Sequence, residues 1–521
     1  MGSKVEKFKY RLDNPRYTIY HRAALGGLAA TVRAWDKERR QRNPNLLPEF
    51  DWSLDARSLT IRWDDSLSDR EAVERLLGES FRLKDGLIDL AGLAIPHARD
   101  DLRAAVHLGL CGTFLQHNKM RPGDNQTHRV PLPQREDGLQ EFVTYKGVRE
   151  YAHQKAQGTK LLDREQLPDT AVIPQSLVPG AVKGASELTA PADEVFLLLY
   201  LAVSCTVYFL RPFDPKEKAQ YAIVIPDIED LEAFVDELHD SHSAPSERQL
   251  DVYHHASYFG RIVAGGEEAA LRYLLDHEMY MKQRARSGIK GCTVVMMGKT
   301  AWSHQQLYRS NVREIPRKFK WKKIFQIAYS NKSLNKLESF SIKAKRKEEV
   351  ETVFYPKTPI SALIARNAVE NRHWISGFAA LVHEPRMYSR LSDSQVRKGL
   401  IEVKRAVTDK IDTQIIDAFQ EAWRFRMKQL YDRAAREELD PDRLLERVRE
   451  RYRFQILRLR TSEALANWFM QFCAAATKGG RLKSLSRELC EFMFDQRNFE
   501  RFQSLLLFAM LTYEPKGEEQ K

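Results

Sequence analysis

Apolar positions near the start of the chain repeat with two different periods. A helical spacing begins after Asn14 and Pro15 and continues to about Arg39, with proline at the favoured first position of a helix. Residues 50–63 instead alternate apolar and polar positions around Asp55, which predicts a β-hairpin. The first part of the chain is therefore predicted to mix helices and strands.

The middle of the chain predicts a strand, two helices and a second strand, in that order. The strands are expected at 221–226 and 291–298, and the helices at 227–240 and 267–276, with a linker at 241–248. This order is compatible with a ferredoxin-like core of the kind found in RNA-recognition motifs. The aromatic signature of those motifs is missing from the sequence.

The stretch 195–210 (VFLLLYLAVSCTVYFL) carries no charge. A helix that spans a membrane needs about 20 apolar residues, and this run is shorter and contains Ser204, Cys205 and Thr206. It predicts a buried core helix and no membrane partner.

Beyond residue 355 the pattern is helical throughout. Ser392 and Gln395 form a capping signature, and Asp440-Pro441 predicts a restart. Residues 388–515 are therefore expected to form an all-α bundle. The predicted fold class is α+β, with mixed α/β N-terminal and central regions followed by an all-α helical bundle.

The pattern divides the chain into three expected domains. Residues 1–190 form an N-terminal α/β domain with a long polar loop, and residues 191–355 form a central α/β domain with a basic segment. Residues 356–521 form the helical bundle.

The charge of the chain favours a polyanionic partner. Its 83 Lys and Arg exceed its 71 Asp and Glu, which gives a net charge of +12 and a pI near 9.2. The five cysteines lack metal-ligand spacing, and the N-terminus lacks an apolar signal core, so a reducing cytoplasmic location is expected.

Positive charge concentrates between residues 309 and 347, where the acidic residues are Glu314 and Glu338 alone. The segment begins at Arg309, and its basic core comprises Arg313, Arg317, Lys318, Lys320, Lys322 and Lys323. Lysine and arginine neutralise phosphates, and interleaved aromatics such as Trp321 and Phe325 could stack on unpaired bases. The alternative is a solvated basic face whose aromatics point into the core.

Two further stretches have side chains suited to nucleic acid. The predicted polar loop at 112–140 offers amides and basic groups for hydrogen bonds to base edges, and an ordinary surface loop is the alternative. Its residues of interest are Asn118, Lys119, Arg121, Asn125 and Gln126. In 443–460, Arg443, Arg447 and Arg451 share one helical face, which could bind phosphates or merely pair with Glu446 and Glu450.

Catalytic motifs are missing from the sequence. It lacks the P-loop, G-x-S-x-G, H-E-x-x-H and kinase patterns, so no enzymatic activity and no cofactor are expected. His239-Asp240 leaves one alternative open, a metal-dependent nuclease or phosphohydrolase. A helical interaction scaffold whose charge only solubilises it is the other alternative.

Three features together resemble the large subunit of type I CRISPR effector complexes (Cascade), in its MYXAN-like branch. They are a strand entering Gly298–Gln306 (GKTAWSHQQ), the basic stretch after it, and the helical C-terminal bundle. A helix is expected to begin near Ala301.

The resemblance implies a non-catalytic protein that binds guide RNA, target double-stranded DNA and the displaced single strand. It implies recognition of the target-flanking motif (PAM), stabilisation of the R-loop, and contact with the backbone, small and 5′-end subunits of Cascade. A helicase-nuclease or a transposition adaptor would be recruited afterwards. The C-terminal bundle would be small-subunit-like from about residue 387. The motif residues expected to hold nucleic acid or brace the fold are Lys299, Trp302, Gln305, Gln306 and Arg309.

Overall fold

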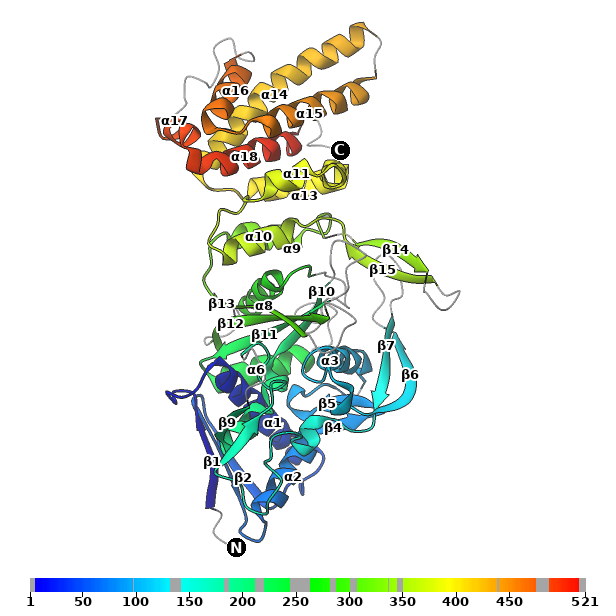
Figure 1. Ribbon diagram of the computed structural model, residues 1–521, viewed down its shortest axis with the longest axis vertical. Helices are drawn as coiled ribbons and strands as arrows, with labels where there is room; N and C mark the ends of the chain where they lie inside the picture. The colour runs from blue at the N-terminus through cyan, green and yellow to red at the C-terminus, as the bar shows by residue number, and fades with distance from the viewer. Residues whose placement is uncertain are drawn as a thin grey trace. The chain divides into compact units, whose positions relative to one another are not determined.

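The computed structural model groups the chain into two compact units (Figure 1). One unit comprises Met1–Lys318 with Phe340–Tyr355, and the other Phe319–Ser339 with Pro356–Lys521. The structure describes residues 5–96, 98–131, 142–181, 187–210, 220–243, 263–281, 287–299, 307–335, 337–343, 350–437, 440–474 and 487–514.

In the described part of the chain, the strands all precede residue 357. They are β1 (Val5–Arg11), β2 (Phe50–Leu54), β3 (Ser58–Trp63), β4 (Phe81–Lys84), β5 (Leu87–Leu90), β6 (Gly123–Pro131), β7 (Phe142–Val148), β8 (Thr170–Ile173), β9 (Leu188–Pro191), β10 (Thr206–Leu210), β11 (Gln220–Ile228), β12 (Ile289–Lys299), β13 (Leu307–Pro316), β14 (Leu337–Lys343) and β15 (Val350–Pro356).

Helices of the first unit lie between and around these strands. They are α1 (Ile19–Gln41), α2 (Asp69–Ser80), η1 (Ala91–Leu93), α3 (Asp100–Gly112), η2 (Asn118–Met120), η3 (Ala152–Lys155), α4 (Ala192–Leu198), α5 (Leu201–Ser204), α6 (Leu231–Ser243) and α8 (Gly266–Met281).

The second unit is built largely from helices. They are α9 (Lys322–Ser330), α10 (Ile360–Val369), α11 (Phe378–His383), α12 (Pro385–Ser392), α13 (Ser394–Arg405), α14 (Lys410–Arg436), α15 (Pro441–Arg458), α16 (Ser462–Ala474), α17 (Arg487–Phe494), η5 (Gln496–Asn498) and α18 (Phe499–Leu511). The predicted fold class, α/β regions followed by an all-α region, is confirmed.

The N-terminal sheet has the order β1-β3-β2, with antiparallel neighbours. The predicted hairpin is present as β2–β3. The Asp55 carboxylate closes its turn by accepting hydrogen bonds from the backbone amides of Arg57 and Ser58 at 2.7 and 2.8 Å. Aspartate favours turns because its side chain bonds the backbone two residues on, which is why this element could be read locally.

Helix α1 is the central buried element of the first unit. It packs against α4, α5, α6, η1 and β11. Two adjacent glycines permit this close packing. A Cβ on Gly26 would stand 2.0 Å from Cδ1 of Ile228, and one on Gly27 would stand 2.1 Å from the carbonyl oxygen of Tyr200. Position 27 therefore accepts only glycine without movement of the neighbouring backbone, whereas a side chain at position 26 would first displace the end of the Ile228 side chain.

The central sheet has the order β10-β11-β12-β13, and every neighbouring pair is antiparallel. Helix α8 packs on β11 and β12, and α1 packs on β11 (Figure 1). The predicted order of strand, helix, helix and strand is present as β11, α6, α8 and β12. However, a ferredoxin-like core contains split βαβ units with parallel strands, and this sequential antiparallel sheet does not have that topology.

The apolar run 195–210 is not the single helix that its length and composition predicted. It forms α4, α5 and then β10, which pairs with β11 from Thr206 to Leu210. A continuous apolar run fits a buried helix and a buried strand equally well, and here pairing with β11 decides. Within the described ranges, no helix is both long and apolar enough to cross a membrane.

The second unit buries aromatic side chains between α14, α15 and α16. Phe419 and Trp423 of α14 contact Phe472 of α16, and Tyr452 of α15 packs edge-on against Trp423 at 5.4 Å. The predicted restart at Pro441 is confirmed. The cap of α13 is Asp393 rather than Ser392, and its carboxylate accepts from the amides of Gln395 and Val396.

A buried carboxylate joins three segments of this unit. Asp412 is fully buried and accepts hydrogen bonds from Arg501 at 2.6 and 3.0 Å and from the indole of Trp374 at 2.8 Å. The His373 ring lies 3.1 Å away. Burial pushes the pKa of Asp412 upward, but His373, Arg501 and Trp374 together outweigh burial and leave that pKa below the ordinary value.

The glycine pair yields the first prediction. Gly27→Ala should destabilise the first unit by about 1–3 kcal/mol, because its methyl group would overlap the Tyr200 carbonyl. Gly78→Ala on α2 is the matched control: no atom lies within 4 Å of its added Cβ, so it should stabilise by up to about 1 kcal/mol. Thermal melting of both variants measures this. A Gly27→Ala melting temperature equal to that of wild type would contradict the packing described.

Asp412 yields the second prediction. Asp412→Asn should cost about 3 kcal/mol at neutral pH, because it removes one partner of a buried ion pair. A folded-state pKa that is depressed adds stability above the unfolded pKa, and this contribution disappears as pH falls. The difference between wild type and variant should therefore narrow below about pH 4.

Hydrogen exchange of the α14 backbone measures this loss locally. The control is Asp417→Asn, an exposed carboxylate on the same helix. If the α14 amides of both variants are equally protected from hydrogen exchange at neutral pH, the ion pair of Asp412 contributes little to the stability of this unit.

Candidate nucleic-acid interface

The motif that prompted the resemblance lies at the β12–β13 hairpin. Lys299 ends β12 and pairs with Leu307, and Arg309 pairs with Met297. Trp302, Gln305 and Gln306 lie in 300–306, outside the described residues. The chain is already a strand at Leu307, so the helix expected near Ala301 does not continue into this region.

The basic core of 309–347 is divided between the two units. Arg309 and Arg313 belong to β13, and the amide of Arg317 donates to the carbonyl of Lys290. Lys318 is the last residue of its part of the first unit. Lys320, Lys322 and Lys323 belong to the second unit.

Lysines gather at the start of α9. Lys320 and Lys323 are exposed and Lys322 is half-buried. The first turn of a helix already carries partial positive charge from its free amides, so lysines there raise the local potential further. This end of α9 has no acidic residue in its first turn. It is a place where phosphate would relieve repulsion.

The described aromatics of this segment serve the core. Phe325 and Tyr329 are buried. Trp321 has a left-handed backbone (φ 64°), its indole donates to the carbonyl of Arg372 at 2.8 Å, and its ring packs edge-on against His373. The core interpretation is confirmed for Phe325 and Tyr329, whereas Trp321 is half-buried and held by Arg372 and His373.

Helix α15 separates its arginines by face. Tyr452, Arg453 and Ile456 are buried, whereas Arg443, Arg447 and Arg451 are exposed on another side. Residues four apart share one side of a helix, so these three form a stripe. Arg443 also lies 3.5 Å from Asp440.

The stripe contains an aromatic that sequence reasoning missed. Phe454 is 45% exposed and lies three residues after Arg451, on the same side of the helix. The guanidinium of the buried Arg453 lies 4.8 Å from the centroid of its ring. We call Arg443, Arg447, Arg451 and Phe454 the arginine stripe. Its sequence signal is the helical spacing of Phe454 from the arginines.

The polar loop predicted at 112–140 is partly regular structure. Asn118 and Lys119 lie exposed in η2, and Asn125 and Gln126 lie in β6, which pairs with β7 across an irregular register after Gly123. The loop prediction was wrong for residues 123–131, because this polar stretch pairs as a strand with β7, the next strand along the chain. The Nε of Arg121 donates to the carbonyl of Leu115 at 2.8 Å, so this side chain braces its own turn.

The position of His239 does not support the alternative of a metal-dependent nuclease or phosphohydrolase. His239 is buried, its Nε2 lies 3.0 Å from the carbonyl of Gly92, and burial lowers its pKa. Asp240 lies half-buried beside it in sequence. Among the residues that the structure describes, no group of three or more His, Cys, Asp or Glu could hold a metal ion.

Comparisons with known proteins match both ends of the chain and most of its length. Residues 9–199 match the DevT N-terminal domain, and residues 404–521 match the DevT C-terminal domain. The arginine stripe lies within the second match. The chain is also 24% identical to the "CRISPR-associated protein Cas8a1/Csx13" of Myxococcus xanthus, over 98% of this chain and 89% of that protein. The chain is thus a distant homologue of a CRISPR-associated Cas8a1/Csx13 protein and matches the DevT domains near both of its ends.

Proposed function

We propose that this chain is the non-catalytic large subunit of a type I CRISPR effector complex, acting in the cytoplasm. The observation that carries the proposal is its similarity to a CRISPR-associated protein along nearly its whole length. The basic pI of about 9.2 and the exposed cations of α9 and α15 support a nucleic-acid partner. In this role the chain binds guide RNA, target duplex and displaced strand beside the other Cascade subunits.

In this proposal, two surfaces bind different parts of the target DNA. The η2 and β6 segment presents Asn118, Lys119 and Gln126 to solvent, which suits hydrogen bonds to base edges of the target-flanking motif. The arginine stripe suits a single strand, because its guanidinium groups can neutralise phosphates while an aromatic ring stacks on a base. Recruitment of a helicase-nuclease or a transposition adaptor would follow R-loop formation.

Assembly tests the proposed role. The chain should co-purify with guide RNA when it is co-expressed with the backbone and 5′-end subunits of a type I effector complex from the same organism. Binding of target DNA by this complex should depend on complementarity to the guide, since pairing reads the sequence. If the chain can be removed from the complex and the complex still binds target DNA with unchanged affinity, the proposal is overturned.

The stripe yields a residue-level prediction. Phe454→Ala should weaken single-stranded DNA binding by about 5- to 100-fold, because one stacked base contributes about 1–3 kcal/mol. The ring is 45% exposed, so the fold should tolerate its removal. Fluorescence anisotropy with a labelled oligonucleotide measures the affinity.

Phe494→Ala is the matched control for this variant. Phe494 ends α17 and is also 45% exposed. Equal affinity of the two variants would show that Phe454 does not stack on bases.

A further inference from the structure

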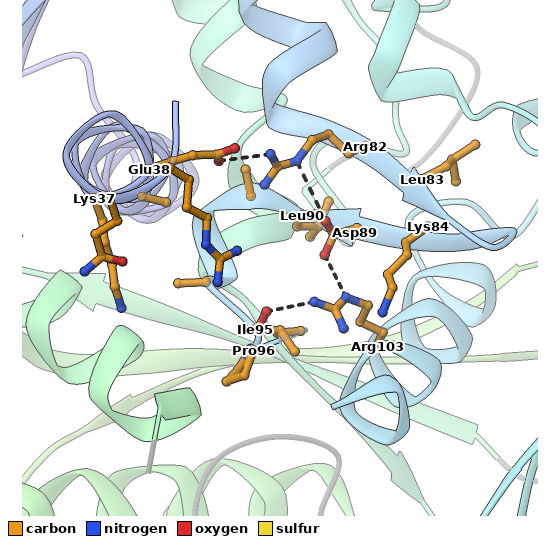
Figure 2. Close-up of a pocket in the computed structure, with 15 residues that line it drawn as sticks. Lys37, Glu38, Arg82, Leu83, Lys84, Asp89, Leu90, Ile95, Pro96 and Arg103 are labelled. Carbon is orange, nitrogen blue, oxygen red and sulfur yellow. Dashed lines mark hydrogen bonds and ion pairs between the residues drawn. The ribbon is translucent and has the colours of Figure 1, made fainter. Parts of the chain in front are cut away.

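A hollow of about 590 Å³ opens in the first unit, between the C-terminal half of α1, the β4–β5 hairpin, η1 and α3 (Figure 2). Ligand sites commonly occupy about 300–1,000 Å³, so one small organic molecule fits. The hollow lies inside the segment that matches the DevT N-terminal domain.

Positive charge exceeds negative charge in the lining of this hollow. Its basic residues are Lys37, Arg42, Arg82, Lys84 and Arg103, and its acidic residues are Glu38 and Asp89. Asp100 adds one carboxylate from the side, 2.8 Å from Lys84. Several of these cations are already paired, but the five basic residues still outnumber the three nearby carboxylates, and this excess of positive charge favours the binding of an anion.

Two arginines form the rigid back of the hollow. Figure 2 shows a continuous chain of contacts from Glu38 through Arg82, Asp89 and Arg103 to the carbonyl of Ile95. Arg103 has only 2% of its side chain exposed and is also 3.1 Å from Asp100. The Nε of Arg82 is buried and faces Asp89 Oδ2 at 3.7 Å, too far for a hydrogen bond, and no other described residue accepts a hydrogen bond from it. These contacts hold both guanidinium groups in place at the back of the hollow, and the long Arg82–Asp89 contact leaves the Nε of Arg82 without a hydrogen bond.

Lys37 and Lys84 flank this chain from opposite sides in Figure 2. Lys37 extends from an exposed position on α1, and no carboxylate of the described residues pairs with it. It is free to turn toward a bound anion.

Apolar groups line the remainder of the hollow. They come from Ala34, Leu83, Leu90, Ile95 and Pro96. A purely inorganic anion would gain nothing from these groups. A ligand with a flat organic part beside a phosphate would use both kinds of surface.

We propose that this hollow binds a nucleoside 5′-phosphate, either free or as the phosphorylated end of a strand. Lys37 and the Arg82 guanidinium hold the phosphate, and the apolar groups pack on the nucleoside. This site goes beyond the proposed role in the effector complex and does not depend on it.

Binding of AMP to the isolated full-length chain tests the proposal. Isothermal titration calorimetry should show binding of AMP, weaker binding of inorganic phosphate, and weaker binding still of adenosine. Lys37→Glu should weaken AMP binding at least tenfold, since about 1.4 kcal/mol corresponds to a factor of ten. The control is Arg40→Glu, the same charge reversal at an exposed position of α1 that does not line the hollow.

Three results would overturn the proposal. The first is that AMP does not bind at about 1 mM, a concentration that would still reveal a weak site. The second is that Lys37→Glu and Arg40→Glu bind AMP with equal affinity. The third is that adenosine binds as tightly as AMP. Unchanged melting temperatures of both variants would exclude unfolding as the cause of a loss.

A pair of oligonucleotides identifies the source of the phosphate. A 5′-phosphorylated oligonucleotide that binds in a Lys37-dependent way, while its 5′-hydroxyl counterpart binds less tightly, supports a strand end. AMP binding without this preference supports a free nucleotide. Neither result depends on assembly with CRISPR subunits, so failure of one proposal is distinguishable from failure of the other.

Discussion

The packing of α1 against the backbone at Tyr200 is the constraint on which the first unit depends. The break between α4 and α5 places the Tyr200 carbonyl against α1, and only glycine at position 27 leaves room for it. Gly26 leaves room for the side chain of Ile228 of β11 beside it. The hydroxyl of Tyr200 lies 2.9 Å from Ser80 Oγ, which connects this contact to α2. The same helix carries Lys37 and Glu38 to the hollow, so the position of that site follows from the glycine contact.

Arginine serves two opposite purposes in this protein. Arg103, Arg272 and Arg453 are almost fully buried, and each has a carboxylate partner. Removing such a charge from water is costly unless it is paired, so these side chains hold elements together. The exposed arginines of α15 remain in contact with water, so they do not need a buried carboxylate partner and their charge can interact with a binding partner. The net charge of +12 does not distinguish the two groups.

Elements whose signals are local were predictable. The β2–β3 hairpin follows from alternation and from the turn chemistry of Asp55, and the start of α15 follows from a capping residue before Pro441. Strands without the alternating pattern were not. β10 lies in an uninterrupted apolar run and β6 in a polar stretch, and only their pairing with the next strands along the chain, β11 and β7, shows that they are strands.

The sequence by itself determined the fold class, the helical C-terminal region, the excess of positive charge and the residues that prompted the likeness to Cascade large subunits. Periodicity and composition are properties of neighbouring residues, so they can be read without coordinates. Only the tertiary structure decided which charged and aromatic side chains remain available. Trp321 and Phe325 are used by the core, while Phe454 stays exposed among arginines and Lys37 meets Arg82 at one hollow. Exposure and convergence depend on which distant surfaces pack together, and that is a property of the whole fold.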